Sequence, residues 1–261
     1  MTASSRTRHQ VRAHSFNAAA AQYAANRPSY PPALLDALEE TAGRPLVGAR
    51  AIDVGAGTGM ATALLRDRGA HVVAVEPGDG MARQFRTALP HTPLVRGDGN
   101  ALPFADSTAD FVTYAQAWHW TDPARAVPEA MRVLRPGGAL ALWWNMDALD
   151  IPWIARQEAR VARYFGGDAG GRKGGATQRA AVALTDAGVV PEVVARSVRW
   201  SRTVSLDTHL ANIGSHSIFL VHGEEGTASF LSEERGHLLE VFPDGMVEET
   251  YDADLLVLLR P

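Results

Sequence analysis

The chain has no cysteine and a single lysine among its 261 residues, and both shortages exclude kinds of chemistry. Without cysteine there is no disulfide, no thiolate zinc site and no cysteine nucleophile. The one lysine, Lys173, is followed by glycine, whereas a Walker-type phosphate loop needs Ser or Thr at that place. We therefore exclude P-loop NTPase chemistry, disfavour a lysine Schiff base, and expect a cytoplasmic protein.

Long apolar runs and basic stripes are also missing. The longest apolar run, 138–146, has half of the roughly 18 residues that a membrane span needs. The first residues carry arginines without the apolar segment of a secretory signal. The net charge is −4 and the arginines are scattered, so we expect no membrane and no nucleic-acid partner, and a monomer or homodimer.

Between about 50 and 145, short apolar runs alternate with amphipathic stretches. This order predicts βαβ units and an α/β fold with a doubly wound, mostly parallel sheet. The expected strands are 50–57, 71–77, 92–98, 109–116 and 138–145, and the expected helices are 58–70, 78–90 and 122–138.

The flanking segments predict additions to this core. We expect an N-terminal helical cap at 1–45 and a core at 46–261, the core interrupted by a glycine-rich loop at 166–178. A helical cover over the active site is expected at about 205–241. The expected flanking elements are helices at 15–27, 31–43 and 151–165, a strand at 189–200 and a closing hairpin-like edge at 246–260.

The segment "IDVGAGTGM" (52–60) places three glycines between a strand and a helix. Glycines allow a tight turn and a close approach of the backbone to a ligand. Asp53, Glu76 and Asp98 come at the ends of three successive strands, so we expect their carboxylates to face one crevice. A dinucleotide-binding loop would have glycine where Met60 stands. The acidic crevice instead suits a nucleoside with a cationic tail.

These motifs occur in a fixed order with "GDGNALPF" (97–104), "AQAWHW" (115–120) and "RVLRPGGALAL" (132–142). In that order they resemble the class I S-adenosylmethionine-dependent methyltransferases. The segment with Tyr23, Arg27 and Tyr30, together with the His119–Trp120 pair, resembles the trans-aconitate-methyltransferase-like small-molecule group. The resemblance implies a seven-stranded Rossmann-like sheet whose last strand is antiparallel.

The resemblance also implies a site for S-adenosyl-L-methionine. The glycine loop would hold the methionine part, Glu76 the ribose and Asp98 the adenine amino group. Arg27 would contact the cofactor carboxylate, unless it only caps a helix. The implied cofactor residues are Tyr23, Arg27, Asp53, Gly55, Ala56, Gly57, Gly59, Glu76, Pro77, Met81, Asp98, Gly99, Asn100 and Gln116.

The Trp118-His119-Trp120 triplet follows the fourth strand, where ligands bind in doubly wound sheets. His119 has no histidine at a metal-ligand spacing, so no metal is expected. It is either a base or substrate-orienting residue, or a histidine that holds the loop. A wall of aromatic side chains favours a small apolar or aromatic acceptor. The predicted substrate-binding residues are Trp118, Trp120, Trp144 and His216.

The leading hypothesis is thus a methyltransferase acting on a small molecule, with a carboxylate or hydroxyl of a secondary metabolite as one acceptor. A cofactor-binding protein without methyl transfer, such as a cyclase or assembly partner, stays open because the chemistry depends on positioning. An NAD(P)-dependent oxidoreductase is disfavoured by Met60 and by the lack of a Tyr-x-x-x-Lys dyad.

Overall fold

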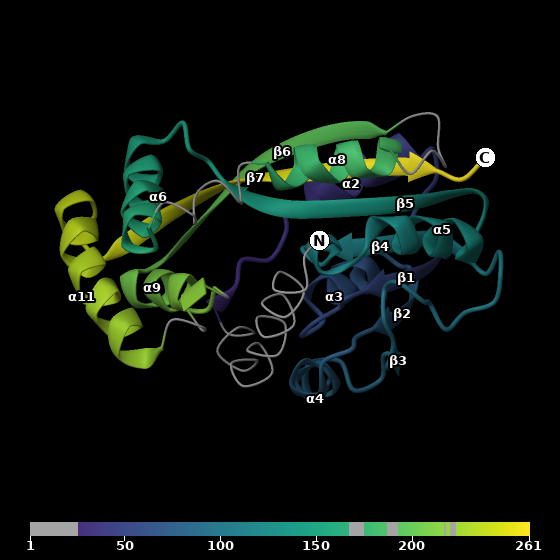
Figure 1. Cartoon of the computed structure of the whole chain (residues 1–261), viewed down its shortest axis with the longest axis horizontal. Coiled ribbons are helices and arrows are strands. Elements are labelled where there is room, and N and C mark those ends of the chain that lie inside the picture. Colours follow the sequence, from purple (N-terminus) through teal and green to yellow (C-terminus); the bar gives the residue numbers. More distant parts are fainter. Residues whose placement is uncertain (1–25, 167–174, 187–192, 217, 220–222) are drawn as a thin grey trace. The chain divides into compact units, whose positions relative to one another are not determined.

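A computed structural model describes residues 26–166, 175–186, 193–216, 218–219 and 223–261. Its centre is one seven-stranded sheet in the order β3-β2-β1-β4-β5-β7-β6 (Figure 1). The strands are β1 (Arg50–Val54), β2 (His71–Val75), β3 (Leu94–Val95), β4 (Ala109–Ala115), β5 (Leu134–Asp147), β6 (Val194–Ser205) and β7 (Met246–Leu259).

The helices that alternate with these strands follow the expected order. They are α2 (Pro32–Ala42), α3 (Met60–Asp67), α4 (Asp79–Ala88), α5 (Pro123–Val133), α6 (Pro152–Tyr164), α8 (Ala176–Asp186), α9 (Leu206–Gly214) and α11 (Glu224–Val241). The first five strands pair in parallel and the last strands run antiparallel. The predicted seven-stranded Rossmann-like α/β fold is confirmed.

Several elements differ from their predicted extent. The strand expected at 189–200 is β6, Val194–Ser205, and the last residues of the expected loop 166–178 begin α8. The helix expected to reach residue 138 ends at Val133, where β5 begins. Arg135 precedes a proline, which disfavours helical backbone, and Gly137 is left-handed with φ 71°. The expected strand at 92–98 shrinks to the two residues of β3.

The closing segment was predicted as a hairpin-like edge, and this is wrong. Residues 246–259 form one strand, β7, which lies between β5 and β6. Most of its side chains are buried, as an inner strand requires, whereas β6 has alternating or exposed positions that suit an edge.

The chain divides into two compact units, each made of separated segments. The unit of the glycine loop comprises Ser29–Asn145, Gly175–Val198 and Ala253–Pro261. Within it, α3 packs on β1 and β2, and α5 packs on β4 and α8. We call it the nucleotide unit. The predicted boundary at residues 45 and 46 stays a prediction.

The second compact unit comprises the described parts of 1–28, 146–174 and 199–252. Here α11 packs against α6 and α9. We call it the helical unit. The apolar core of the helical unit is formed by Val161, Leu206, Leu210, Ile213, Phe219, Phe230, Leu238 and Val247.

Among the described residues, no helix combines the length and the apolar character that a membrane span requires.

Candidate cofactor and acceptor site

The glycine loop connects the end of β1 to the start of α3, and its three glycines are all left-handed. A Cβ on Gly55 would lie 2.5 Å from the Cβ of Ala117, so this glycine lets the loop after β4 approach. A Cβ on Gly59 would lie 2.8 Å from Leu89. Gly57 differs, because among the described residues the atom nearest to its Cβ would be 4.0 Å away. The backbone at Gly57 therefore faces open space that a ligand can enter.

Glu76 follows β2 and its carboxylate binds the glycine loop directly. Oε2 accepts a hydrogen bond of 2.9 Å from the N–H of Gly57, and Oε1 accepts one of 2.6 Å from the N–H of Gly78. Burial raises the pKa of Glu76, while the two N–H donors and the positive charge of Arg96 act in the opposite direction. A carboxylate has about four acceptor positions, so two stay available for hydroxyl donors.

Asp53 does not face the crevice as predicted. Its side chain is fully buried in β1. Its two oxygens accept hydrogen bonds from the hydroxyls of Thr62 (2.5 Å) and Thr113 (3.0 Å), which belong to α3 and β4. Burial, together with the nearby charge of Glu76, raises the pKa of Asp53 to about 6 despite these two bonds. The carboxylate thus joins three core elements.

The loop after β3 is tied to the start of α5. Asp98 is exposed and accepts hydrogen bonds from the backbone N–H and the side-chain amide of Asn100. The Asn100 oxygen accepts from the N–H of Asp122, the residue that caps α5. Gly99 is buried, and its carbonyl accepts from the Tyr114 hydroxyl at 3.1 Å. The position of Asp98 is therefore fixed by neighbours on two sides.

Gln116 has strained backbone at the end of β4. Its φ is 53°, a left-handed value that a non-glycine residue adopts rarely. A hydrogen bond of 2.8 Å from its N–H to the carbonyl of Trp143 holds this conformation. Such strain is typical of functional sites, and here it turns the chain toward Ala117, which meets Gly55.

The Trp118–Trp120 triplet forms one turn of 3₁₀-helix, η1, and its three rings separate. Trp118 is buried against Tyr114, edge to face at 5.0 Å. Trp118 therefore packs in the core, and this position gives no support to the prediction that Trp118 contacts the substrate. His119 is exposed, with its ring 4.6 Å from the half-buried ring of Trp120. Among the described residues, no group of three potential metal ligands occurs.

Trp143 and Trp144 near the end of β5 are both buried, although alternation along a strand predicts that only one packs in the core. Trp143 meets Tyr30 edge to face at 5.9 Å. In the described part of the chain, the indole Nε1 atoms of both tryptophans have no hydrogen-bond partner. The buried hydroxyl of Thr58, in the glycine loop, also has none there. Buried donors of this kind are rare, so a ligand with acceptor atoms suits the site.

The remaining predicted residues are placed as follows. Ala56 donates its N–H to the Val75 carbonyl, Pro77 is exposed after β2, and Met81 is buried in α4. Arg27 and His216 belong to the helical unit, whereas the glycine loop and Glu76 belong to the nucleotide unit. Tyr23 lies outside the described residues, as do most of the predicted helix 15–27 and of the loop 166–178.

The sequence reasoning missed the residues that hold the site together. Thr62 and Thr113 fix Asp53, and Ala117 receives Gly55. Arg96 binds the carbonyl of Pro77 and pairs with Asp79. Each acts through a contact between distant segments, and the only local signal was the small residue at 117 between two larger neighbours.

Comparison with known protein families supports the same interpretation. Residues 52–142 match the model of a methyltransferase domain. Together with the confirmed fold and the glycine loop, this match shows that the segment is similar to a methyltransferase domain.

Individual relatives match mainly in this region. An uncharacterized methyltransferase of Mycobacterium tuberculosis is 47% identical over 140 residues, which are 54% of this chain and 56% of the relative. A demethylmenaquinone methyltransferase of Beutenbergia cavernae is 40% identical over 111 residues, 42% of this chain and 44% of the relative. The chain thus spans about half the length of the relatives it matches.

A solved structure extends the likeness in fold to most of the chain. A protein of Anaeromyxobacter dehalogenans, described as a suggested type II methyltransferase, has a TM-score of 0.66. Its sequence identity is 24%, over 89% of this chain and 97% of that one. At this identity the likeness concerns the fold.

Proposed function

We propose that the chain is an S-adenosylmethionine-dependent methyltransferase that acts on a small-molecule acceptor. The observation that carries the proposal is the Glu76 carboxylate, which binds the N–H of Gly57 where the loop faces open space. A buried carboxylate beside an open glycine suits the two hydroxyls of a ribose. The neighbouring exposed Asp98 suits the amino group of an adenine.

The cofactor would supply a methyl group on a positively charged sulfur. The residues of the chain then have to bind and orient the two reactants. Correct alignment of reactants is worth up to roughly 7–11 kcal/mol of the barrier in model reactions. The fixed loops at Gly55 and Gln116, each held by a contact to a neighbouring segment, provide rigid positions for this alignment.

His119 is proposed to orient the acceptor or to accept its proton. It is exposed at the carboxyl end of β4 and rests against the Trp120 ring. A hydroxyl acceptor has to lose a proton, and a nearby base typically contributes 10²–10⁴-fold. A carboxylate acceptor needs no base, so the importance of His119 depends on the acceptor.

We further propose that the acceptor is an aromatic or apolar small molecule. The Trp120 ring beside His119 and the indoles of Trp143 and Trp144 support this, and so do relatives named demethylmenaquinone methyltransferases. Quinols are therefore suitable first acceptors for an assay, followed by aromatic carboxylates. The absence of cysteine fits the reducing cytoplasm, where we expect the protein to act.

Calorimetry with S-adenosylmethionine and with its demethylated product tests cofactor binding. We expect both to bind the wild type, and Glu76→Gln to bind each about 10- to 100-fold more weakly. The reason is that an amide cannot accept from both backbone N–H groups and from a ribose together; bonds to charged groups contribute about 1.5–3 kcal/mol. Glu40→Gln, on the exposed face of α2, is the matched control.

Lack of cofactor binding by the wild type would reject the proposal. Equal affinities of the two glutamate variants would remove Glu76 from the site. Methyl transfer is then assayed across the acceptor panel by formation of the demethylated cofactor. Tight binding with no turnover on any acceptor would favour the alternative of a cofactor-binding protein that does not methylate.

A further inference from the structure

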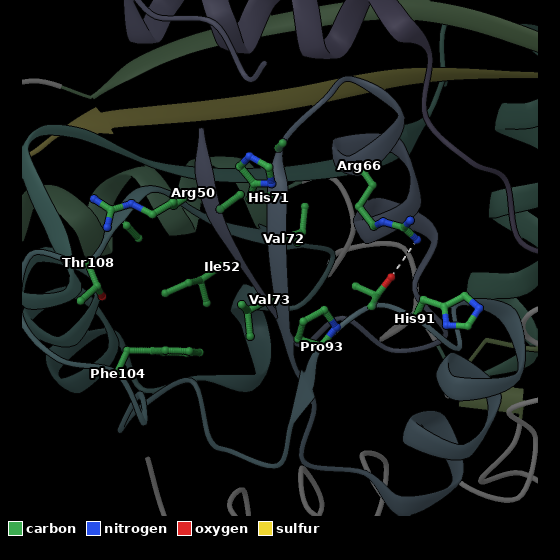
Figure 2. Close-up of a pocket in the computed structure, with 14 residues that line it drawn as sticks. Arg50, Ile52, Arg66, His71, Val72, Val73, His91, Pro93, Phe104 and Thr108 are labelled. Atoms are coloured by element: carbon green, nitrogen blue, oxygen red, sulfur yellow. Dashed lines mark hydrogen bonds between the residues drawn. The ribbon is translucent and has the colours of Figure 1, made fainter. Parts of the chain in front are cut away.

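A second cavity lies at the amino ends of the parallel strands, whereas the glycine loop and Glu76 follow their carboxyl ends. It has a volume of about 520 Å³ and is lined by 14 residues of the nucleotide unit (Figure 2). Small-molecule sites typically have about 300–1,000 Å³. The lining residues are Arg50, Ala51, Ile52, Arg66, Ala70, His71, Val72, Val73, His91, Thr92, Pro93, Phe104, Thr108 and Ala109.

The middle of this cavity is apolar. Ile52 of β1 and Val73 of β2 are register partners in the sheet. In Figure 2 they lie between Phe104 on one side and Pro93 on the other. Phe104 is only half-buried, although aromatic side chains contribute most when they are covered. An apolar ligand body would cover this surface.

The charge on the rim has one sign. Among the described residues, the lining contains two arginines and two histidines, and no aspartate or glutamate. Arg66 and His91 lie on the same side in Figure 2, where Arg66 donates to the hydroxyl of Thr92 at 2.8 Å. A guanidinium has five N–H donors, so this bond uses one of them.

Arg50 adds positive charge on the opposite side. Its guanidinium pairs with Asp110 at a nitrogen–oxygen distance of 3.9 Å. Asp110 also pairs with Arg44 and Arg135, so three guanidinium groups share one carboxylate. The surroundings of the cavity therefore carry an excess of positive charge that an anion would neutralise.

We propose that this cavity binds a small organic anion, with its carboxylate at Arg66 and its aromatic or short aliphatic body on Ile52, Val73 and Phe104. An inorganic anion would leave the apolar middle uncovered, and a neutral apolar molecule would leave the cationic rim without a partner. The site is separate from the proposed cofactor site, because the two lie at opposite ends of β1 and β2.

Calorimetric titration of the full chain with 2-naphthoate tests the site. The neutral 2-naphthamide has the same aromatic rings without the negative charge and serves as the comparison. We expect naphthoate to bind at least about ten-fold more tightly than the amide, and Arg66→Gln to remove that difference. Arg196→Gln, which removes an exposed arginine of β6 that does not line the cavity, is expected to bind naphthoate like the wild type.

A second variant tests the apolar part. Phe104→Ala is expected to weaken both compounds by a similar factor, with thermal melting to show that the variant is folded. The proposal is overturned if naphthoate and naphthamide bind the wild type equally, or if Arg66→Gln keeps full affinity. It is also overturned if the demethylated cofactor displaces naphthoate, since the anion would then occupy the methyl-transfer site.

Discussion

Gly57 and Gly43 have nearly the same left-handed backbone, with φ values of 58° and 62°, but different surroundings. Gly43 ends α2, and its N–H binds the carbonyls of Glu39 and Glu40. Gly57 lies in the glycine loop, and its N–H binds Glu76. In the part of the chain that the structure describes, neither glycine has an atom closer than 4.0 Å to where a Cβ would stand. Substitutions at these two glycines therefore distinguish the effect of backbone strain on stability from the effect of an added methyl group on ligand binding.

We expect Gly57→Ala and Gly43→Ala to destabilise the fold similarly, by about 1 kcal/mol each, because alanine disfavours this backbone. Only Gly57→Ala should weaken cofactor binding, by ten-fold or more, because its methyl group enters the open space. Urea unfolding and calorimetry measure the two effects. Similar cofactor affinities would show that the ligand does not approach Gly57.

At the scale of helices and strands, buried polar side chains join the elements of the helical unit. A buried chain of polar groups links α6, α9, α11 and β7. Gln157 donates to the Glu234 carboxylate at 3.0 Å and lies 3.0 Å from His209 Nε2. His209 donates from Nδ1 to Glu249 at 2.7 Å, and Arg202 donates to the same carboxylate at 2.6 Å.

In this polar network, the Glu249 carboxylate accepts from both His209 and Arg202. Burial raises the pKa of Glu249, but His209 and Arg202 lower it more, and the result is a lowered pKa. Arg202 also donates to the carbonyl of Asn26, at 3.0 Å. The Glu249 carboxylate thereby holds the arginine that binds the first described residues of the chain.

Glu249→Gln is expected to destabilise the chain by about 3–5 kcal/mol, because it leaves buried donors without their charged partner. Glu248→Gln, the exposed neighbour on β7, should change stability by less than about 0.5 kcal/mol. Denaturant unfolding at pH 7 compares them. A loss below 1 kcal/mol for Glu249→Gln would mean that the polar chain contributes little.

For the whole molecule, two buried carboxylates, one in each unit, contribute to the pH dependence of stability in opposite directions. In the helical unit, the lowered pKa of Glu249 gives stability that is lost as the pH falls. In the nucleotide unit, the pKa of Asp53 is raised from 3.8 to about 6, so the folded state holds this proton more tightly than the unfolded state. That stability is fully present below about pH 4 and is lost as the pH rises through 6.

Asp53→Asn is expected to remove the second of these contributions. Between pH 4 and pH 7, the wild type should lose up to about 3 kcal/mol of unfolding free energy through Asp53. The variant lacks this group, so its unfolding free energy should fall by up to about 3 kcal/mol less over the same pH range. The exposed Asp67→Asn should keep the wild-type difference. Urea unfolding at the two pH values measures it, and parallel curves for all three proteins would contradict the raised pKa.

The regular part of the fold could be predicted because its signals are local. Alternating apolar and amphipathic runs predicted the strands and helices of residues 50–133, and the helix expected to begin at residue 122 is α5, which Asp122 caps. The closing strand was misplaced because its position between β5 and β6 depends on pairing between distant segments. No local pattern distinguishes an inner strand from an edge hairpin when both are apolar.

The sequence by itself determined the likeness to a methyltransferase domain, since the glycine loop, Glu76 after the next strand and the later motifs are short local segments in a fixed order. The tertiary structure alone decided what each side chain does. Asp53 and Glu76 look alike in the sequence, yet two threonines enclose Asp53 while Glu76 meets the open glycine. The physical reason is that burial and hydrogen-bond partners come from segments far apart in the chain, so they exist only once the chain has folded.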